Sequence, residues 1–312
     1  MVSHDDIRMA ADLIRQGGLV AFPTETVYGL GANALDERAV ARVYDVKGRP
    51  AVSPLIVHVS SIEMARELAA EWPESAERLA RRYWPGPLTL VLPKRPKIPD
   101  LVTAGLQTVG LRMPAHPVAL DLIREAGVPI AAPSANRFAQ LSPTTAGHVR
   151  ESLGGLVDLV LDAGPTDVGI ESTVLSLAGE RPLLLRLGMI SRRDLEELIG
   201  PVEVAEAPPP GSHASPGLHP RHYSPRTPLV LVRQGRVPAQ GRGAFLGFAE
   251  GASAPTAELV SMPPDPALYA AMLYQTLHRL DREGLDWIAV EQPPDTPDWA
   301  AILDRLKRAA EG

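Results

Sequence analysis

The sequence predicts an α/β protein in which a twisted sheet of mixed parallel and antiparallel strands, flanked by helices, is followed by a smaller α/β domain. Short apolar runs typical of buried strands are interleaved with stretches of helical periodicity, although the two kinds do not alternate strictly. A proline-rich stretch separates the long first part from a shorter second part. With 312 residues and a hydrophobic fraction of 45%, the chain is long enough for two domains.

The first domain is expected to span residues 1–200. It opens with a helix that follows Ser3 and stops at Gly17 and Gly18, and a second helix begins at Asp36. Further helical patterns cover residues 62–70, 74–83, 117–126, 144–153 and 191–199. Apolar runs predict strands at residues 19–22, 55–59, 88–92, 109–113, 129–132, 156–161, 174–177 and 183–185.

Residues 201–228 break this pattern because they contain many prolines and few apolar side chains. Such a composition favours an extended linker over a packed element. Residues 229–312 return to strand and helix patterns and are expected to form the second domain. Its predicted strands cover residues 229–232, 244–248, 259–262 and 287–290, and its predicted helices cover residues 268–280 and 299–310.

The composition excludes several classes of function. The chain has no cysteine, so disulfides, thiolate catalysis and cysteine-ligated metals are ruled out. The net charge of -6 argues against tight, non-specific binding to nucleic acid. No apolar run approaches the roughly 20 residues that span a bilayer, and the N-terminal residues are polar and acidic, unlike a signal peptide. We therefore expect a cytoplasmic protein with no membrane contact.

The most informative stretch runs from Gly17 to His58. A strand-like run ends in a proline and leads into a loop of hydroxyls and glycines, residues 24–31, and two cations, Lys47 and Arg49, follow beside a turn. Loops of this kind at strand ends build ligand sites in α/β proteins, and the composition suits an anion such as phosphate. Residues 29–34 match G-x-G-x-x-A, but they lie too far from the preceding strand for a dinucleotide fingerprint, and no P-loop is present.

Further polar residues follow other predicted strands. Ser134 and Asn136 form a second loop, which could be a plain turn. Arg112 lies in a run that reads as buried, so it needs an anionic partner, either an internal carboxylate or a ligand. His58, at the end of a buried strand, is on its own more often a core histidine than a catalytic one. Taken with Arg186 at another strand end, these residues predict an anion pocket.

Several short motifs occur in order along the chain, namely FPTETVYGLG, KGRP, SPLIVH, TVGLRMPAH, APSAN, SPT and ESTV, with a further patch at residues 215–225. In these motifs the sequence resembles the threonylcarbamoyl-AMP synthase family, in its long form. The resemblance implies a YrdC-like first domain, a small Rossmann-like second domain, and a linker that folds back over the active site. The chain departs from the usual family pattern at residues 137–141, 162–164 and 218–220.

The resemblance also implies an activity. The family makes threonylcarbamoyl-AMP and pyrophosphate from L-threonine, bicarbonate or CO2, and ATP, with Mg²⁺ accompanying the ATP. The product then goes to a tRNA threonylcarbamoyl-transfer complex. Tight direct binding of nucleic acid is not expected. Two alternatives stay open: an RNA-binding or translation-associated module with a basic cavity, and a domain that transfers another carbamoyl group.

Matching motifs carry the family's functional positions onto this chain. The catalytic group falls on Lys47, Arg49, Ser134 and Asn136. The threonine-binding positions fall on Thr26, His58, Arg112, Ser134 and Ser172. The ATP-binding positions fall on Lys47, Arg49, Ser53, Thr108, Asn136, Thr144, Arg186 and Tyr223. No side chain is assigned to a metal, and the two glycines at 29 and 31 are expected to leave room for the ligands.

Overall fold

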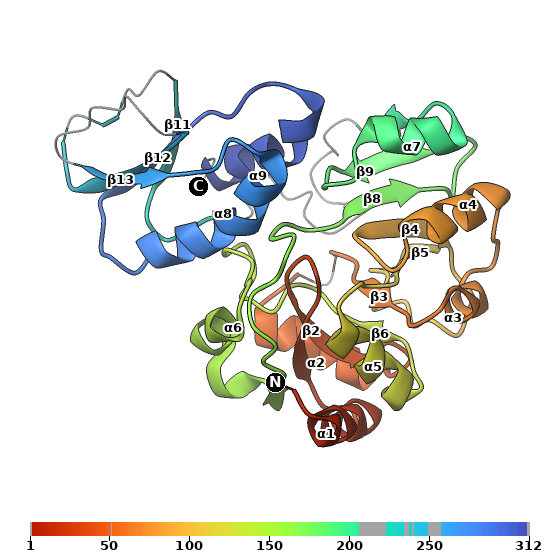
Figure 1. Cartoon of the computed structure of the whole chain (residues 1–312). Helices are drawn as coiled ribbons and strands as arrows, with labels where there is room; N and C mark the ends of the chain where they lie inside the picture. Colours follow the sequence, from red (N-terminus) through yellow and green to blue (C-terminus); the bar gives the residue numbers. More distant parts are fainter. Residues whose placement is uncertain are drawn as a thin grey trace.

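The structure, a computed structural model, describes residues 2–50, 52–205, 223–233, 237–238, 240–248 and 257–310 (Figure 1). Two sheets organise these residues. The first has the strand order β10-β9-β8-β4-β5-β3-β6-β2-β1-β7, and the second has the order β11-β14-β12-β13. Both parallel and antiparallel pairs occur in the first sheet, whereas all pairs in the second are parallel. The predicted fold class is confirmed.

The strands of the first sheet are β1 (Val20–Pro23), β2 (Tyr28–Asn33), β3 (Ile56–His58), β4 (Leu88–Pro93), β5 (Thr108–Arg112), β6 (Ile130–Ala131), β7 (Leu159–Val160), β8 (Thr173–Ser176), β9 (Leu183–Arg186) and β10 (Glu203–Val204). The accompanying helices are α1 (His4–Arg15), α2 (Glu37–Lys47), α3 (Ile62–Leu68), α4 (Glu74–Tyr83), α5 (Pro117–Ala126), α6 (Ala146–Leu153) and α7 (Arg192–Ile199), with a 3-10 turn at Gly154–Leu156. In the second part lie β11 (Leu229–Val232), β12 (Gly243–Gly247), β13 (Ala257–Ser261), β14 (Trp287–Glu291), α8 (Pro266–Leu280), the 3-10 turn Pro297–Trp299 and α9 (Ala300–Ala310).

The two faces of the first sheet are covered by different helices. The side chains of Val20 and Phe22 point to the face that α1 and α5 cover. Leu19 and Ala21, which alternate with them, point to the face covered by α2, α3, α4, α6 and α7. This alternation follows from the period of two along a strand, and it buries β1 on both sides. Within the part of the chain that the structure describes, no helix is both long and apolar enough to cross a membrane.

Two strands, β2 and β10, were not predicted from the sequence. Residues 28–33, expected as part of a loop, form β2, which pairs antiparallel with β1. A Cβ atom added to Gly31 would lie 2.7 Å from the ring of Phe22 and 2.8 Å from Ile130. Gly31 therefore makes room for core side chains and not for a ligand, and our expectation for this glycine was wrong. Only Gly29 of the two lines a cleft.

The predicted linker coincides only partly with described residues. Its start contains β10, which adds to the edge of the first sheet beside β9. Residues 206–222, with most of the motif at 215–225, lie outside the described residues. The chain is described again from Tyr223, whose buried side chain joins a hydrophobic cluster with Tyr274 and Leu306 of the second part. Val27, Leu141 and Ile170 of the first part belong to the same cluster, so the two parts pack against each other there.

Candidate active site

A partly open cleft lies where several strands of the first sheet end. Loops and strand ends far apart in the sequence contribute to its lining: Thr24, Thr26, Val27, Gly29, Arg49, Ile56, His58, Arg112, Ala132, Pro133, Ser134, Glu171, Arg186 and Tyr223. Seven of the residues singled out from the sequence are among them, namely Thr26, Arg49, His58, Arg112, Ser134, Arg186 and Tyr223. The structure thus brings together the two loops that we expected to share one edge of the sheet.

His58 and Arg112 are the last residues of β3 and β5, and they lie side by side in the parallel register of these strands. Arg112 is buried and forms an ion pair with Glu25, with 2.8 Å between Nη2 and Oε1. Its Nε donates to the carbonyl of Gly86 at 3.3 Å. Of the two partners expected for this arginine, an internal carboxylate is therefore present. Arg112 also lines the cleft, so a ligand anion can reach it in addition.

His58 lines the cleft and packs against a buried aromatic side chain. The ring of Phe22 meets its imidazole edge-on, with 6.2 Å between the centroids. Its Nδ1 is buried and has no hydrogen-bond partner among the described residues. Burial, and secondarily the charge of Arg112, lowers the pKa of His58 to about 3. The imidazole is therefore neutral at physiological pH and can exchange one hydrogen bond with a polar ligand.

This lowered pKa predicts a stability that depends on pH. Between the unfolded value of 6.5 and the folded value of about 3, the unfolded chain binds a proton that the folded chain excludes. As far as His58 is concerned, the free energy of unfolding is therefore highest above pH 6.5. It falls as the pH drops from 6.5 towards 3, by up to about 1.4 kcal/mol per pH unit. We expect His58→Asn to lose less stability than the unsubstituted protein between about pH 7 and pH 5 in urea unfolding. Parallel pH slopes for the two proteins would contradict a neutral, buried His58.

Lys47 and Arg49 lie on either side of Gly48, which ends α2 in the left-handed conformation with a φ of 61°. Both side chains are buried. The Lys47 Nζ donates to the carbonyl of Ser134 at 2.5 Å and to that of Asn136. Burial, and then the charge of Arg49, lowers the pKa of Lys47 well below its usual value. Lys47 thus connects the end of α2 to the loop at residues 134–136, and its own side chain is not among those that line the cleft.

Arg49 and Arg186 bring positive charge to the cleft itself. Arg49 donates to Ser53 Oγ at 2.5 Å, and Arg186 donates to the carbonyl and to Oγ of Ser172, each at 3.0 Å. Burial lowers the pKa of Arg49 to about 10 and also lowers that of Arg186. Both guanidinium groups stay charged at neutral pH. Because burial makes that charge costly, an anion bound in the cleft would stabilise it.

Several of the predicted residues do not line the cleft. Ser53 and Ser172 contact arginines that do, and Asn136 donates to the carbonyls of residues 137 and 140. Thr144 contacts the ring of His148. Thr108 begins β5, about 13 Å along the strand from Arg112, and lines a smaller, separate pocket. The sequence placed Thr108 near the site through its motif, but it lies at the opposite end of the strand.

Two family models match the chain. Residues 12–188 match the family described as "Telomere recombination", and residues 190–311 match "Threonylcarbamoyl-AMP synthase, C-terminal domain". The threonylcarbamoyl-AMP synthase of Pyrococcus abyssi is 42% identical, over 97% of this chain and 94% of its own. That of Bacillus subtilis is 44% identical, over 98% of this chain and 93% of its own. The chain belongs to the threonylcarbamoyl-AMP synthase family.

Solved structures of the family share its fold over nearly the whole chain. The crystal structure of Pyrococcus abyssi Sua5 complexed with L-threonine matches with a TM-score of 0.92 at 41% identity. The match covers 99% of this chain and 95% of that one. This agreement extends through the second sheet, so the two-part architecture implied by the motifs is confirmed, as is the family.

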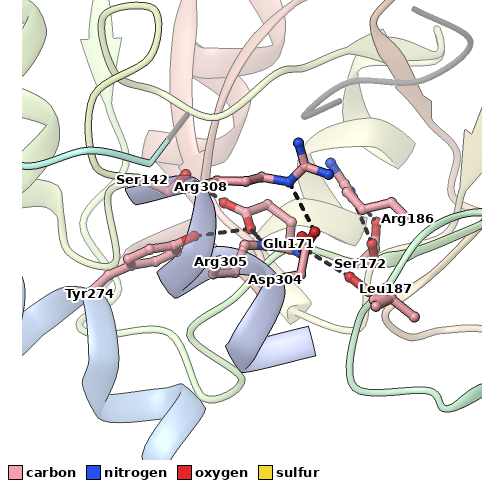
Figure 2. A network of polar contacts seen from close by, with 9 residues as sticks. All are labelled: Ser142, Glu171, Ser172, Arg186, Leu187, Tyr274, Asp304, Arg305 and Arg308. Atoms are coloured by element: carbon pink, nitrogen blue, oxygen red, sulfur yellow. Dashed lines mark hydrogen bonds and ion pairs between the residues drawn. The ribbon is translucent and has the colours of Figure 1, made fainter. Parts of the chain in front are cut away.

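Two carboxylates at or beside the cleft were not predicted from the sequence. Glu25 lies in the loop after β1 and was read only as part of a polar motif, although the buried Arg112 called for such a partner. Glu171 stands in the ESTV motif just before β8, and no role is predicted for it. Its carboxylate accepts hydrogen bonds from Ser142 at 2.6 Å, Tyr274 at 3.2 Å and Arg305 at 2.7 Å (Figure 2). The last two partners come from the second part of the chain, which no local pattern could reveal.

Proposed function

We propose that this protein joins L-threonine, bicarbonate or CO2, and ATP into threonylcarbamoyl-AMP with release of pyrophosphate. The observation that carries this proposal is the grouping of charges around one cleft. Arg112 lies beside Thr26 and His58, while Arg49 and Arg186 lie in the same lining. The group around Arg112 suits the carboxylate and amine of an amino acid. The pair Arg49 and Arg186 suits a polyphosphate.

In this proposal, L-threonine binds at the ends of β3 and β5. Its carboxylate pairs with Arg112, whose guanidinium is held in place by Glu25. Neutral His58 and the hydroxyls of Thr26 and Ser134 contact the polar atoms of the amino acid. Ser172, which lies behind the lining, acts on the site through its hydrogen bonds with Arg186. A planar guanidinium with five donors can serve Glu25 and a second carboxylate together.

The triphosphate of ATP lies against Arg49 and Arg186, with Lys47 behind the loop at residues 134–136. The threonine amine adds to CO2 and loses a proton, or reacts with bicarbonate and releases water, to form a carbamate. An oxygen of this carbamate attacks the α-phosphorus, and the bond to pyrophosphate breaks. Negative charge grows on the departing pyrophosphate, where these cations stabilise it. No side-chain nucleophile takes part, in keeping with a chain that lacks cysteine.

Mg²⁺ is proposed to enter with ATP. Within the described ranges, no group of three or more histidine, aspartate or glutamate side chains gathers to hold a metal. Glu171, a carboxylate in the cleft lining, is occupied by Arg305, Tyr274 and Ser142. This donor set fits an ion held by phosphate oxygens and water, which would neutralise part of the triphosphate charge.

We also propose how the cleft is covered, where the enzyme works and what receives its product. The linker expected to cover the cleft spans residues 201–228; residues 206–222 of it lie outside the described residues, and Tyr223 within it lines the cleft. A cover of this kind would keep water from the adenylate. We place the enzyme in the cytoplasm, where the adenylate would pass to a tRNA threonylcarbamoyl-transfer complex.

Pyrophosphate release tests the proposal directly. The rate is measured with ATP, Mg²⁺ and bicarbonate, with and without L-threonine, and mass spectrometry identifies the adenylate. We expect release only when threonine is present, and D-threonine is the matched control. Release that is independent of threonine would refute the substrate assignment. Salt-sensitive binding of tRNA by the substrate-free protein, without pyrophosphate release, would favour an RNA-binding module instead.

A further inference from the structure

Arg305 is a buried cation from the second part of the chain that reaches the wall of the cleft. It lies on α9 and is 1% exposed. Its Nε donates to Glu171 at 2.7 Å, Nη2 donates to the carbonyl of Leu187 at 2.8 Å, and Nη1 donates to Asp304 at 2.6 Å. Its guanidinium carbon also lies 5.1 Å from the ring centroid of Tyr223. Arg305 therefore contacts two residues of the cleft lining at once.

Glu171 connects Arg305 to the polyphosphate side of the cleft. Figure 2 shows its carboxylate among Ser142, Tyr274 and Arg305, with Ser172 and Arg186 close by. Ser172 follows Glu171 directly in the chain and accepts two hydrogen bonds from Arg186. A shift of Glu171 would therefore move the partner that orients Arg186.

The charge of Arg305 also matters. Glu171 lines a cleft that we propose to hold a triphosphate, and an unpaired carboxylate there would repel that ligand. Arg305 neutralises it through a direct ion pair in which both side chains are buried. Arg305 is itself shared with Asp304, which also pairs with Arg308, so it is oriented from its own helix. All three nitrogen atoms of its guanidinium donate to protein oxygens. Arg305 is therefore placed to hold Glu171 and not to bind phosphate.

We propose that Arg305 is a positioning residue for ATP. It neutralises Glu171, fixes the Ser172–Arg186 contact and supports the ring of Tyr223. The second domain thereby contributes to nucleotide binding through a side chain and does more than carry the linker. This inference rests on the proposed function, because it assumes that the cleft receives a triphosphate.

The test measures binding of a non-hydrolysable ATP analogue with Mg²⁺ by calorimetry, which needs no turnover. We expect Arg305→Met to weaken binding about 30-fold, and Glu171→Gln in that background to restore affinity to within about threefold, because the unpaired carboxylate is then gone. Glu171→Gln alone should bind the analogue as tightly as, or more tightly than, the unsubstituted protein. That single variant keeps the test decisive if Arg305→Met does not fold.

His278→Ala is the matched control. His278 also joins the two parts, through a contact with the carbonyl of Ser142 at 3.0 Å and a ring stack on His148 at 3.8 Å, but it does not line the cleft. It should lower the melting temperature and leave nucleotide affinity unchanged. The proposal fails if Arg305→Met binds the analogue normally, if its loss is no larger than that of His278→Ala, or if Glu171→Gln does not rescue it. Normal threonine-dependent pyrophosphate release with any of these results would refute the inference alone.

Discussion

Replacing Lys47 with methionine is expected to lower kcat for pyrophosphate release by about 100-fold or more, with little change in the KM for threonine. The substitution removes the buried amine that ties α2 to the loop bearing Ser134 and Asn136. Ser134 of this loop lines the cleft, so its displacement acts where charge develops on the leaving pyrophosphate. Initial rates at saturating substrates, compared with rates from single turnovers, measure the effect on the chemical step.

Lys94→Met is the control for this prediction. Lys94 is also a lysine with a buried side chain, and it pairs with Asp100 at 2.6 Å away from the cleft. Its loss should reduce stability and leave kcat within about twofold of normal, as expected for a residue outside the reacting region. Equal losses of kcat in the two variants would mean that Lys47 acts through stability alone.

Replacing Arg112 with glutamine is expected to raise the KM for threonine by about 100-fold while the KM for ATP changes little. The guanidinium supplies a fork for the threonine carboxylate, and glutamine, which is shorter and neutral, replaces neither the fork nor the charge. The substitution also leaves Glu25 buried without its ion pair, which costs stability. Steady-state kinetics with each substrate varied in turn distinguish the two effects.

A second substitution separates binding from stability at Arg112. In the double variant Glu25→Gln and Arg112→Gln, the buried pair becomes neutral, so the melting temperature should recover. The KM for threonine should stay high because the carboxylate still lacks its cation. Recovery of both quantities together would show that Arg112 serves the fold and not the amino acid.

Much of the fold could be predicted because strands buried on both faces appear as apolar runs. β4 and β8 are of this kind, and their expected ranges agree with the structure to within one residue at each end. β2 could not be recognised, since its glycines signal a turn in isolation and become strand residues only when the ring of Phe22 from β1 fills their place. That packing depends on a neighbouring strand and leaves no local periodicity.

The candidate site, like the fold, could be predicted from the sequence only in part. The motifs indicated Arg112, Arg186 and Ser134, because polar residues at the ends of apolar runs gather at one edge of a sheet. They could not show that Arg112 already holds a carboxylate, nor that Glu171 meets Arg305 from the other domain. A charge partner is specified by the tertiary fold, and a single sequence carries no measure of which distant residues meet.

The pair of Glu171 and Arg305 joins residues 134 positions apart. A chain made on a ribosome emerges from its N-terminus, and its first domain can fold before the rest has been synthesised. At that stage the cleft would have its arginines and its threonine loops, but Glu171 would still lack its cation. Full nucleotide binding would begin only after residue 305 had emerged and α9 had docked. The order of synthesis would thus delay ATP consumption until α9 has been made and has docked.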